Sequence, residues 1–186
     1  AQVASISDDI AYNNHDLEDG LRANLFKINK LNDVPLIKKV LKKHQKNIKK
    51  YRREIIINQI VRDLINFMVL DVIKVTEKNL KKFKIKKPND VYKLNSFVVN
   101  FSPKMKNEVS LIKEFLSINM YNNKSVIKNT NNGKKIINYL FNYLEKYPKR
   151  FINHKLLSFY DKERAISDFI AGMTDRFAIN LYNKIK

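Results

Sequence analysis

Apolar residues recur at intervals of three and four along most of this chain, which is the spacing of amphipathic α-helices. The first such pattern covers about residues 2–19, where Val3, Ile6 and Ile10 fall at helical intervals. Gly20 is placed to end this helix or to kink it. The pattern is already under way at the first residue, and no Ser, Thr, Asp or Asn cap precedes it. We therefore expect the chain to be a fragment of something longer.

Further helices are predicted along the rest of the chain. Residues 35–80 read as one or two long helices, and their apolar stripe is interpreted as core: Ile56, Ile60, Leu64, Phe67 and Leu70. Ser102 and Pro103 open another helix, because both residue types favour helix starts. Amphipathic helices follow over residues 133–147 and 162–185.

Two segments interrupt the helical patterns. Residues 84–101 are irregular, and a short extended piece is expected at residues 97–100. The Asn-rich residues 122–132 are predicted to form a surface loop or short turn.

Composition supports one helical domain. Only 3 Gly and 4 Pro interrupt 186 residues, whereas all-β folds need frequent turn residues. The hydrophobic fraction of 44%, with 11 Phe and 9 Tyr, argues against disorder. We predict a single all-α unit over residues 1–186.

The chain carries a formal net charge of +19, which suits a polyanionic partner. Residues 27–53 hold eleven Lys or Arg and one Asp, and we call the exposed cations of this stretch the basic face. A solvated helix surface explains it, as does contact with phosphate or nucleic acid, including single-stranded DNA. The Lys-, Asn- and Ile-rich composition is also what AT-rich coding produces without any partner.

The chain has no cysteine, which excludes disulfides and thiolate metal sites. No apolar run approaches the roughly 20 residues that span a bilayer, and no signal peptide precedes the first helix. We therefore expect a cytoplasmic protein that does not enter membranes.

An acidic cluster near the start of this basic chain contains the candidate chemistry. Asp8, Tyr12 and Asp16 are spaced i, i+4 and i+8, so they share one helix face over roughly 12 Å. Asp8 could bind a hard divalent cation. The flat Tyr12 ring could pack against a sugar ring, and Asp16 could accept a hydrogen bond from a sugar hydroxyl. A solvated acidic face is the alternative.

Histidines offer little support for a complete metal site. His15 lies seven residues from Asp8, so the two backbones are roughly 10 Å apart, too far to share one ion easily. His44 and His154 have lysine-flanked, polar neighbours and are predicted to be surface residues. Any further ligands would lie before Ala1.

Two long motifs carry a family resemblance. AQVASISDDIAYNNHDLEDGLRANLF, residues 1–26, and DFIAGMTDRFA, residues 168–178, resemble the deoxyguanosinetriphosphate triphosphohydrolase (dGTPase-like) family of the HD-domain superfamily. RDLINFMVLDVI, residues 62–73, is a weaker match. Phe169 and Phe177 stand where the family often has Tyr. The family's upstream His and adjacent His-Asp pair are absent, so the chain resembles the C-terminal part of such a helical bundle.

The resemblance implies roles for particular residues. Asp8 matches the last metal-ligating Asp, Tyr12 the aromatic residue against the deoxyribose, and Asp16 the carboxylate that accepts from the 3′-hydroxyl. Asp9, Glu18 and Asp19 match surrounding or structural positions. Arg53 and Arg62 are candidates for triphosphate contact. No other catalytic residue is expected in this chain.

The family resemblance also implies an activity. A metal-dependent enzyme, with Mg²⁺ or Mn²⁺, would hydrolyse a dNTP such as dGTP to deoxynucleoside and triphosphate. Such enzymes are usually homo-oligomers. With an incomplete ligand set, this chain alone is expected to be inactive. The alternative is a catalytically inactive remnant that acts as an oligomerisation or nucleic-acid-binding module.

Overall fold

The computed structural model describes residues 1–48 and 50–186, and the predicted all-α class is confirmed, since these residues form helices and no strand. The chain folds into two compact units, 1–123 and 124–186, rather than the single unit that the sequence predicts. The helices of the first unit are α1 (Gln2–Arg22), α2 (Pro35–Ile48), α3 (Arg53–Lys82), α4 (Pro88–Tyr92) and α5 (Pro103–Leu116). Those of the second are α6 (Lys124–Lys146), α7 (His154–Phe159), α8 (Lys162–Ala171) and α9 (Asp175–Ile185).

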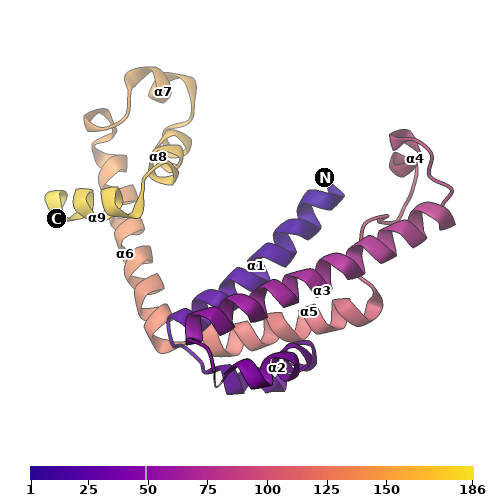
Figure 1. Cartoon of the computed structure of the whole chain (residues 1–186). Coiled ribbons are helices and arrows are strands. Elements are labelled where there is room, and N and C mark those ends of the chain that lie inside the picture. Colours follow the sequence, from indigo (N-terminus) through magenta and orange to yellow (C-terminus); the bar gives the residue numbers. More distant parts are fainter. Residues whose placement is uncertain (49) are drawn as a thin grey trace. The chain divides into compact units, whose positions relative to one another are not determined.

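The first unit is built around α3, the longest helix of the described chain. Figure 1 shows α1 and α5 running alongside it, and α2 packs against it as well. Apolar residues of all four helices form one core, whose largest fully buried members include Leu17, Ile37, Ile60, Leu64 and Ile112. The predicted stripe of α3 is confirmed at Ile56, Ile60 and Leu64, but Leu70 is 45% exposed. Further along, Met68 and Val72 are buried instead, and Met68 meets Asn14 of α1.

Gly20 neither ends nor caps α1, which continues to Arg22. The residue is buried, and a Cβ at this position would lie 2.4 Å from Cε1 of the Phe26 ring. That ring packs edge-on against Phe115 of α5, with 5.0 Å between ring centroids. Close packing of an aromatic side chain therefore explains this glycine, rather than backbone conformation.

The segments predicted as irregular are more helical than expected. α4 interrupts residues 84–101, and residues 97–100 contain a bend at 98 and 99 rather than an extended strand. Of the Asn-rich segment, residues 122 and 123 form the turn before α6, and residues 124–132 belong to α6, which begins at Lys124. Asn lowers helix propensity without breaking a helix, so this segment can extend a helix that packs further along. The buried side chains of α6 begin only at Ile136, which is consistent with a separate core in the second unit.

The second unit packs α8 and α9 against α6. The sequence predicts one helix over residues 162–185, but Gly172 and Thr174 separate α8 from α9. The Thr174 hydroxyl accepts a hydrogen bond from the Phe177 amide at 3.2 Å and caps the new helix. Small apolar clusters, which include Leu140, Leu144 and Ile166, hold these helices together.

Candidate functional site

The candidate site is built on α1. Asp8 and Tyr12 lie one turn apart on its open face, opposite the buried Leu17, and Tyr12 is 70% exposed. Within the described chain, the Asp8 carboxylate takes part in no hydrogen bond or ion pair. The spacing thus brings an unengaged carboxylate and an open aromatic ring together, as the sequence predicts. Their roles toward metal and sugar stay predictions.

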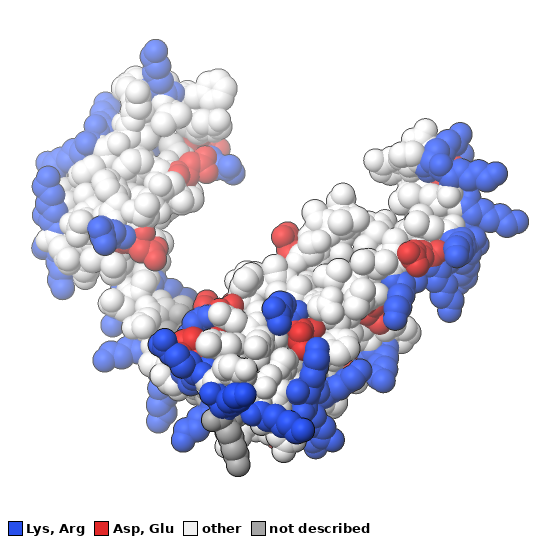
Figure 2. Space-filling view, in the orientation of Figure 1, with Lys and Arg blue, Asp and Glu red and all other residues white. Residues whose placement is uncertain are grey.

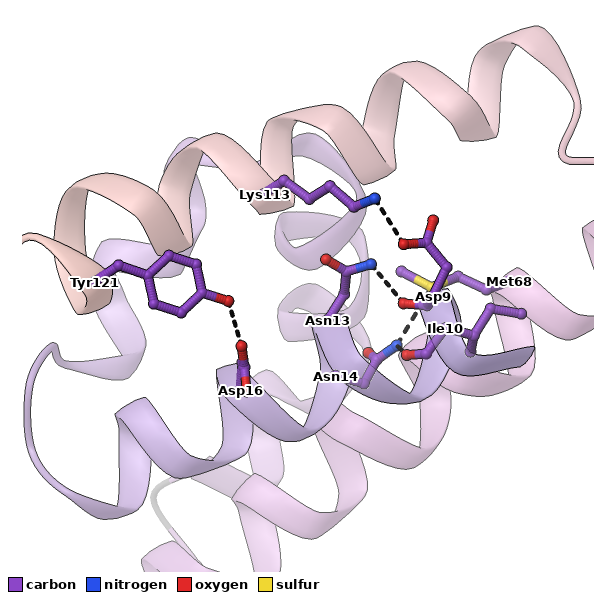
Figure 3. Close-up of polar contacts among 8 residues, drawn as sticks. All are labelled: Asp9, Ile10, Asn13, Asn14, Asp16, Met68, Lys113 and Tyr121. Atoms are coloured by element: carbon purple, nitrogen blue, oxygen red, sulfur yellow. Dashed lines mark hydrogen bonds and ion pairs between the residues drawn. The ribbon is translucent and has the colours of Figure 1, made fainter. Parts of the chain in front are cut away.

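Asp16, one further turn along α1, is half-buried and accepts a hydrogen bond from the hydroxyl of Tyr121 (Figure 3). Tyr121 ends a π-helical turn, Ser117–Tyr121, that continues α5. Burial raises the pKa of Tyr121 above its usual range, and the hydrogen bond and charge of Asp16 raise it further, with a last contribution from Tyr12. The phenol is therefore a proton donor to Asp16 at neutral pH.

Sequence reasoning missed Tyr121. It lies 105 residues from Asp16, and no local spacing links the two. Only the packing of α5 against α1 brings the tyrosine to the candidate site.

Two neighbouring acids of α1 have protein partners. Asp9 pairs with Lys113 of α5 at 2.7 Å, and Glu18 pairs with Arg22 at 2.7 Å (Figure 3 shows the first of these). His15 is exposed, and its Nδ1 lies 3.8 Å from Oε2 of Glu18. It therefore contacts Glu18 rather than Asp8. The cluster thus divides into the partnered Asp9, Asp16 and Glu18 and, within the described chain, two carboxylates without a side-chain contact, Asp8 and Asp19.

Two buried asparagines fix α1 beneath this face. The Asn13 amide donates to the Asp9 carbonyl at 2.5 Å, and the Asn14 amide donates to the Ile10 carbonyl at 2.7 Å. Asn14 also meets the Met68 sulfur at 3.3 Å, which links α1 to α3 (Figure 3). These contacts hold the backbone from which Asp8, Tyr12 and Asp16 project.

A metal ion would find one ligand here. Asp8 supplies the kind of oxygen donor that a hard divalent cation prefers, and it is free to bind. No group of three or more His, Asp and Glu side chains among the described residues could hold an ion. The residues present therefore fit one position of a coordination shell and do not complete it.

The two candidate arginines do not meet. Arg53, at the start of α3, donates to the Leu21 carbonyl at the end of α1 and so satisfies a carbonyl of the last turn. Arg62 is exposed. Nine residues on one helix correspond to about half a turn beyond two full turns, so the arginines point to opposite sides of α3. At most one of them can face a given ligand.

The prediction that His44 is a surface residue is wrong. His44 is only 7% exposed between α2 and α3, and its Nε2 lies 2.9 Å from Oδ2 of Asp63. Lys43 donates to the same oxygen at 2.7 Å. Burial alone would raise the pKa of Asp63, but the hydrogen bonds and charges of Lys43 and His44 outweigh it and lower the pKa. His154, at the start of α7, is exposed as predicted.

The basic face keeps its lysines in solvent. Those of α2 are exposed, and Figure 2 shows Lys and Arg gathered over α2 and again over α4. Lys49 of this stretch lies outside the described residues. Within the described chain, no helix is both long and apolar enough to cross a membrane.

Comparison with known proteins gives consistent matches. A family model described as a phosphohydrolase-associated domain matches residues 99–184. A deoxyguanosinetriphosphate triphosphohydrolase-like protein of Pelagibacter ubique (strain HTCC1062) is 50% identical over 97% of this chain and 48% of its own length. A protein of the same name from Rickettsia typhi (strain ATCC VR-144 / Wilmington) is 36% identical over 100% of this chain and 50% of its own length. The chain spans about half the length of the curated relatives it matches.

Proposed function

We propose that this chain forms part of a metal-dependent dNTP triphosphohydrolase, because it is similar along nearly its whole length to deoxyguanosinetriphosphate triphosphohydrolase-like proteins. The enzyme would convert a dNTP, with dGTP as the first candidate, and water to a deoxynucleoside and triphosphate. The observation that carries this proposal is the unengaged Asp8 on the same open face of α1 as Tyr12, with Asp16 one turn further.

Asp8 would hold a divalent cation, Mg²⁺ or Mn²⁺, with further ligands from the half of the protein that this chain does not cover. Such a cation lowers the pKa of water and offsets the charge of the phosphates. The exposed Tyr12 ring would lie against the deoxyribose and leave no room for a 2′-hydroxyl. Asp16 would accept from the 3′-hydroxyl. Positioning of this kind can lower the activation free energy by several kcal/mol, roughly up to 7–11 kcal/mol in the best cases.

The triphosphate contact is assigned to Arg62 rather than to Arg53. Arg62 is exposed and lies in the segment that matches the family, whereas Arg53 already donates to the Leu21 carbonyl. An arginine guanidinium suits phosphate oxygens because its N–H groups can bind two of them at once.

The test is chromatographic detection of products from dGTP with Mn²⁺ or Mg²⁺. The chain is assayed alone and then together with a polypeptide that supplies the half of its relatives' length that the chain does not match. Deoxyguanosine and triphosphate in the second case support the proposal. Absence of both products in the two cases contradicts it.

In the active preparation, we expect Asp8→Ala to abolish turnover, because the substitution removes the one metal ligand that this chain is proposed to supply. Glu114→Ala is the matched control, since it removes an exposed carboxylate from α5 without touching α1. Unchanged turnover in Asp8→Ala would refute the metal assignment.

A second candidate is a catalytically inactive module that forms homo-oligomers or binds nucleic acid. It is favoured by the exposed lysines of the basic face (Figure 2). Binding of single-stranded DNA should then weaken steeply with salt and be indifferent to dNTP. A fluorescence anisotropy titration at two salt concentrations measures this.

A further inference from the structure

We propose that Tyr121 is a positioning residue that orients Asp16 and thereby sets selectivity for a nucleotide with a free 3′-hydroxyl. This inference rests on the proposed function, since it assigns a task to the sugar-binding part of the same site. Tyr121 belongs to the π-helical turn after α5 and is outside the motif that suggested the site.

The contact between Tyr121 and Asp16 fixes one end of the carboxylate. The phenol donates to Oδ2 of Asp16, as Figure 3 shows, and Oδ1 remains to accept from a ligand. A free carboxylate can rotate and offers about four lone-pair directions, so a fixed donor on one oxygen restricts the directions left to the other. Tyr121 is 44% exposed, so the pair lies where a ligand can reach it.

The backbone is built to aim Tyr121 at α1. The Asn122 amide donates to the Ser117 carbonyl, five residues earlier, at 3.0 Å, which is the bond of a π-helical turn. The Asn119 amide side chain donates to the Phe115 carbonyl at 2.8 Å, and Met120 packs against the core. Each π-turn holds an extra residue compared with an α-helical turn, so it changes the direction in which the following side chain projects. Such turns are rare and often occur at functional sites.

The electrostatics keep Tyr121 in the donor state. Burial and the neighbouring Asp16 hold the phenol pKa above its usual range, so the hydroxyl retains its proton at neutral pH. Tyr12 lies one turn before Asp16 on α1 and makes the smallest contribution to this shift. Tyr12, Asp16 and Tyr121 thus form one polar and aromatic group on the open side of α1.

A purely structural tie between α1 and the π-turn is the alternative. Such a tie would stabilise the fold but would treat all nucleotides alike. If Tyr121 orients Asp16, its loss affects only the hydrogen bond between Asp16 and the 3′-hydroxyl of the nucleotide. The two explanations therefore differ in the response to a nucleotide that lacks the 3′-hydroxyl.

The experiment compares dGTP with 2′,3′-dideoxyGTP in the active preparation of this chain with the polypeptide that supplies the half of its relatives' length that it does not match. For Tyr121→Phe we expect kcat/KM for dGTP to fall about tenfold, as for one lost hydrogen bond to a charged group. The value for dideoxyGTP should change little, so 3′-hydroxyl selectivity falls by the same factor. In Asp16→Asn, adding Tyr121→Phe should cause no further loss of selectivity, because the phenol acts through Asp16.

Tyr139→Phe is the matched control. It also removes one phenol hydrogen bond, to the Ile185 carbonyl at 3.1 Å, but in the second unit. Thermal unfolding of each variant separates loss of fold from loss of selectivity. Equal losses on both nucleotides, or additive losses in the double variant, would overturn the inference and leave the proposed function standing. If the unmodified protein turns over neither nucleotide, the proposed function and this inference both fail.

Discussion

Replacing Asp63 by Asn should weaken the first unit at neutral pH, because Asp63 joins α2 to α3. Its Oδ2 accepts a hydrogen bond from Nζ of Lys43 at 2.7 Å and lies 2.9 Å from Nε2 of His44. The Lys43 side chain is 62% exposed, so that ion pair contributes at most about 1 kcal/mol. The His44 side chain is 8% exposed, and a buried hydrogen bond to a charged group contributes about 1.5–3 kcal/mol. We expect the free energy of unfolding to fall by about 2–3 kcal/mol in total.

The effect should depend on pH in one direction. The pKa of Asp63 is lowered in the folded protein, so the folded state binds this proton more weakly than the unfolded chain does. The stabilisation is complete above the unfolded value of about 3.9 and is lost as the pH falls through the lower folded value. The difference between wild type and Asp63→Asn should thus be full at about pH 5 and above and shrink at lower pH.

Urea unfolding followed by far-UV circular dichroism measures this difference across the pH range. Glu77→Gln is the control, because it neutralises an exposed carboxylate on the same helix, α3. The reasoning is refuted if both variants lose the same free energy at neutral pH. A loss in Asp63→Asn that stays undiminished at about pH 3 would also contradict it.

Three further predictions concern single residues of the fold. Gly20→Ala should destabilise the first unit, because the new methyl meets the Phe26 ring at 2.4 Å and overpacking costs about 1–3 kcal/mol, more than the helix-propensity gain of about 1. Gly133→Ala should stabilise α6 by about 1 kcal/mol, since nothing lies within 4 Å of its Cβ; thermal unfolding of the pair should show opposite signs. Thr174→Ala should cost about 1 kcal/mol by removing the cap on the Phe177 amide, and Thr174→Ser should restore most of it in the same assay.

Local features of the fold could be predicted from the sequence. The periodicity at Ile56, Ile60 and Leu64 identified the buried face of α3, because one helix face is defined by neighbours three and four residues apart. Ser102 and Pro103 marked the start of α5, where the Ser102 hydroxyl accepts from the Met105 amide at 3.1 Å. The four-residue spacing of Asp8 and Tyr12 likewise predicted that both lie on one face of α1. The loop or turn expected over residues 122–132 is limited to residues 122 and 123, because Asn content is a weak signal against a helix that packs further along the chain.

The residue pattern alone thus predicts the helical class, the main helical faces and the spacing of the candidate site on α1. The environments that depend on distant partners come from the tertiary packing. It buried His44 against Asp63, filled the space above Gly20 with the Phe26 ring, and brought Tyr121 to Asp16 across 105 residues. The two differ because helix periodicity comes from backbone hydrogen bonds four residues apart, whereas burial and side-chain pairing depend on which helices pack together.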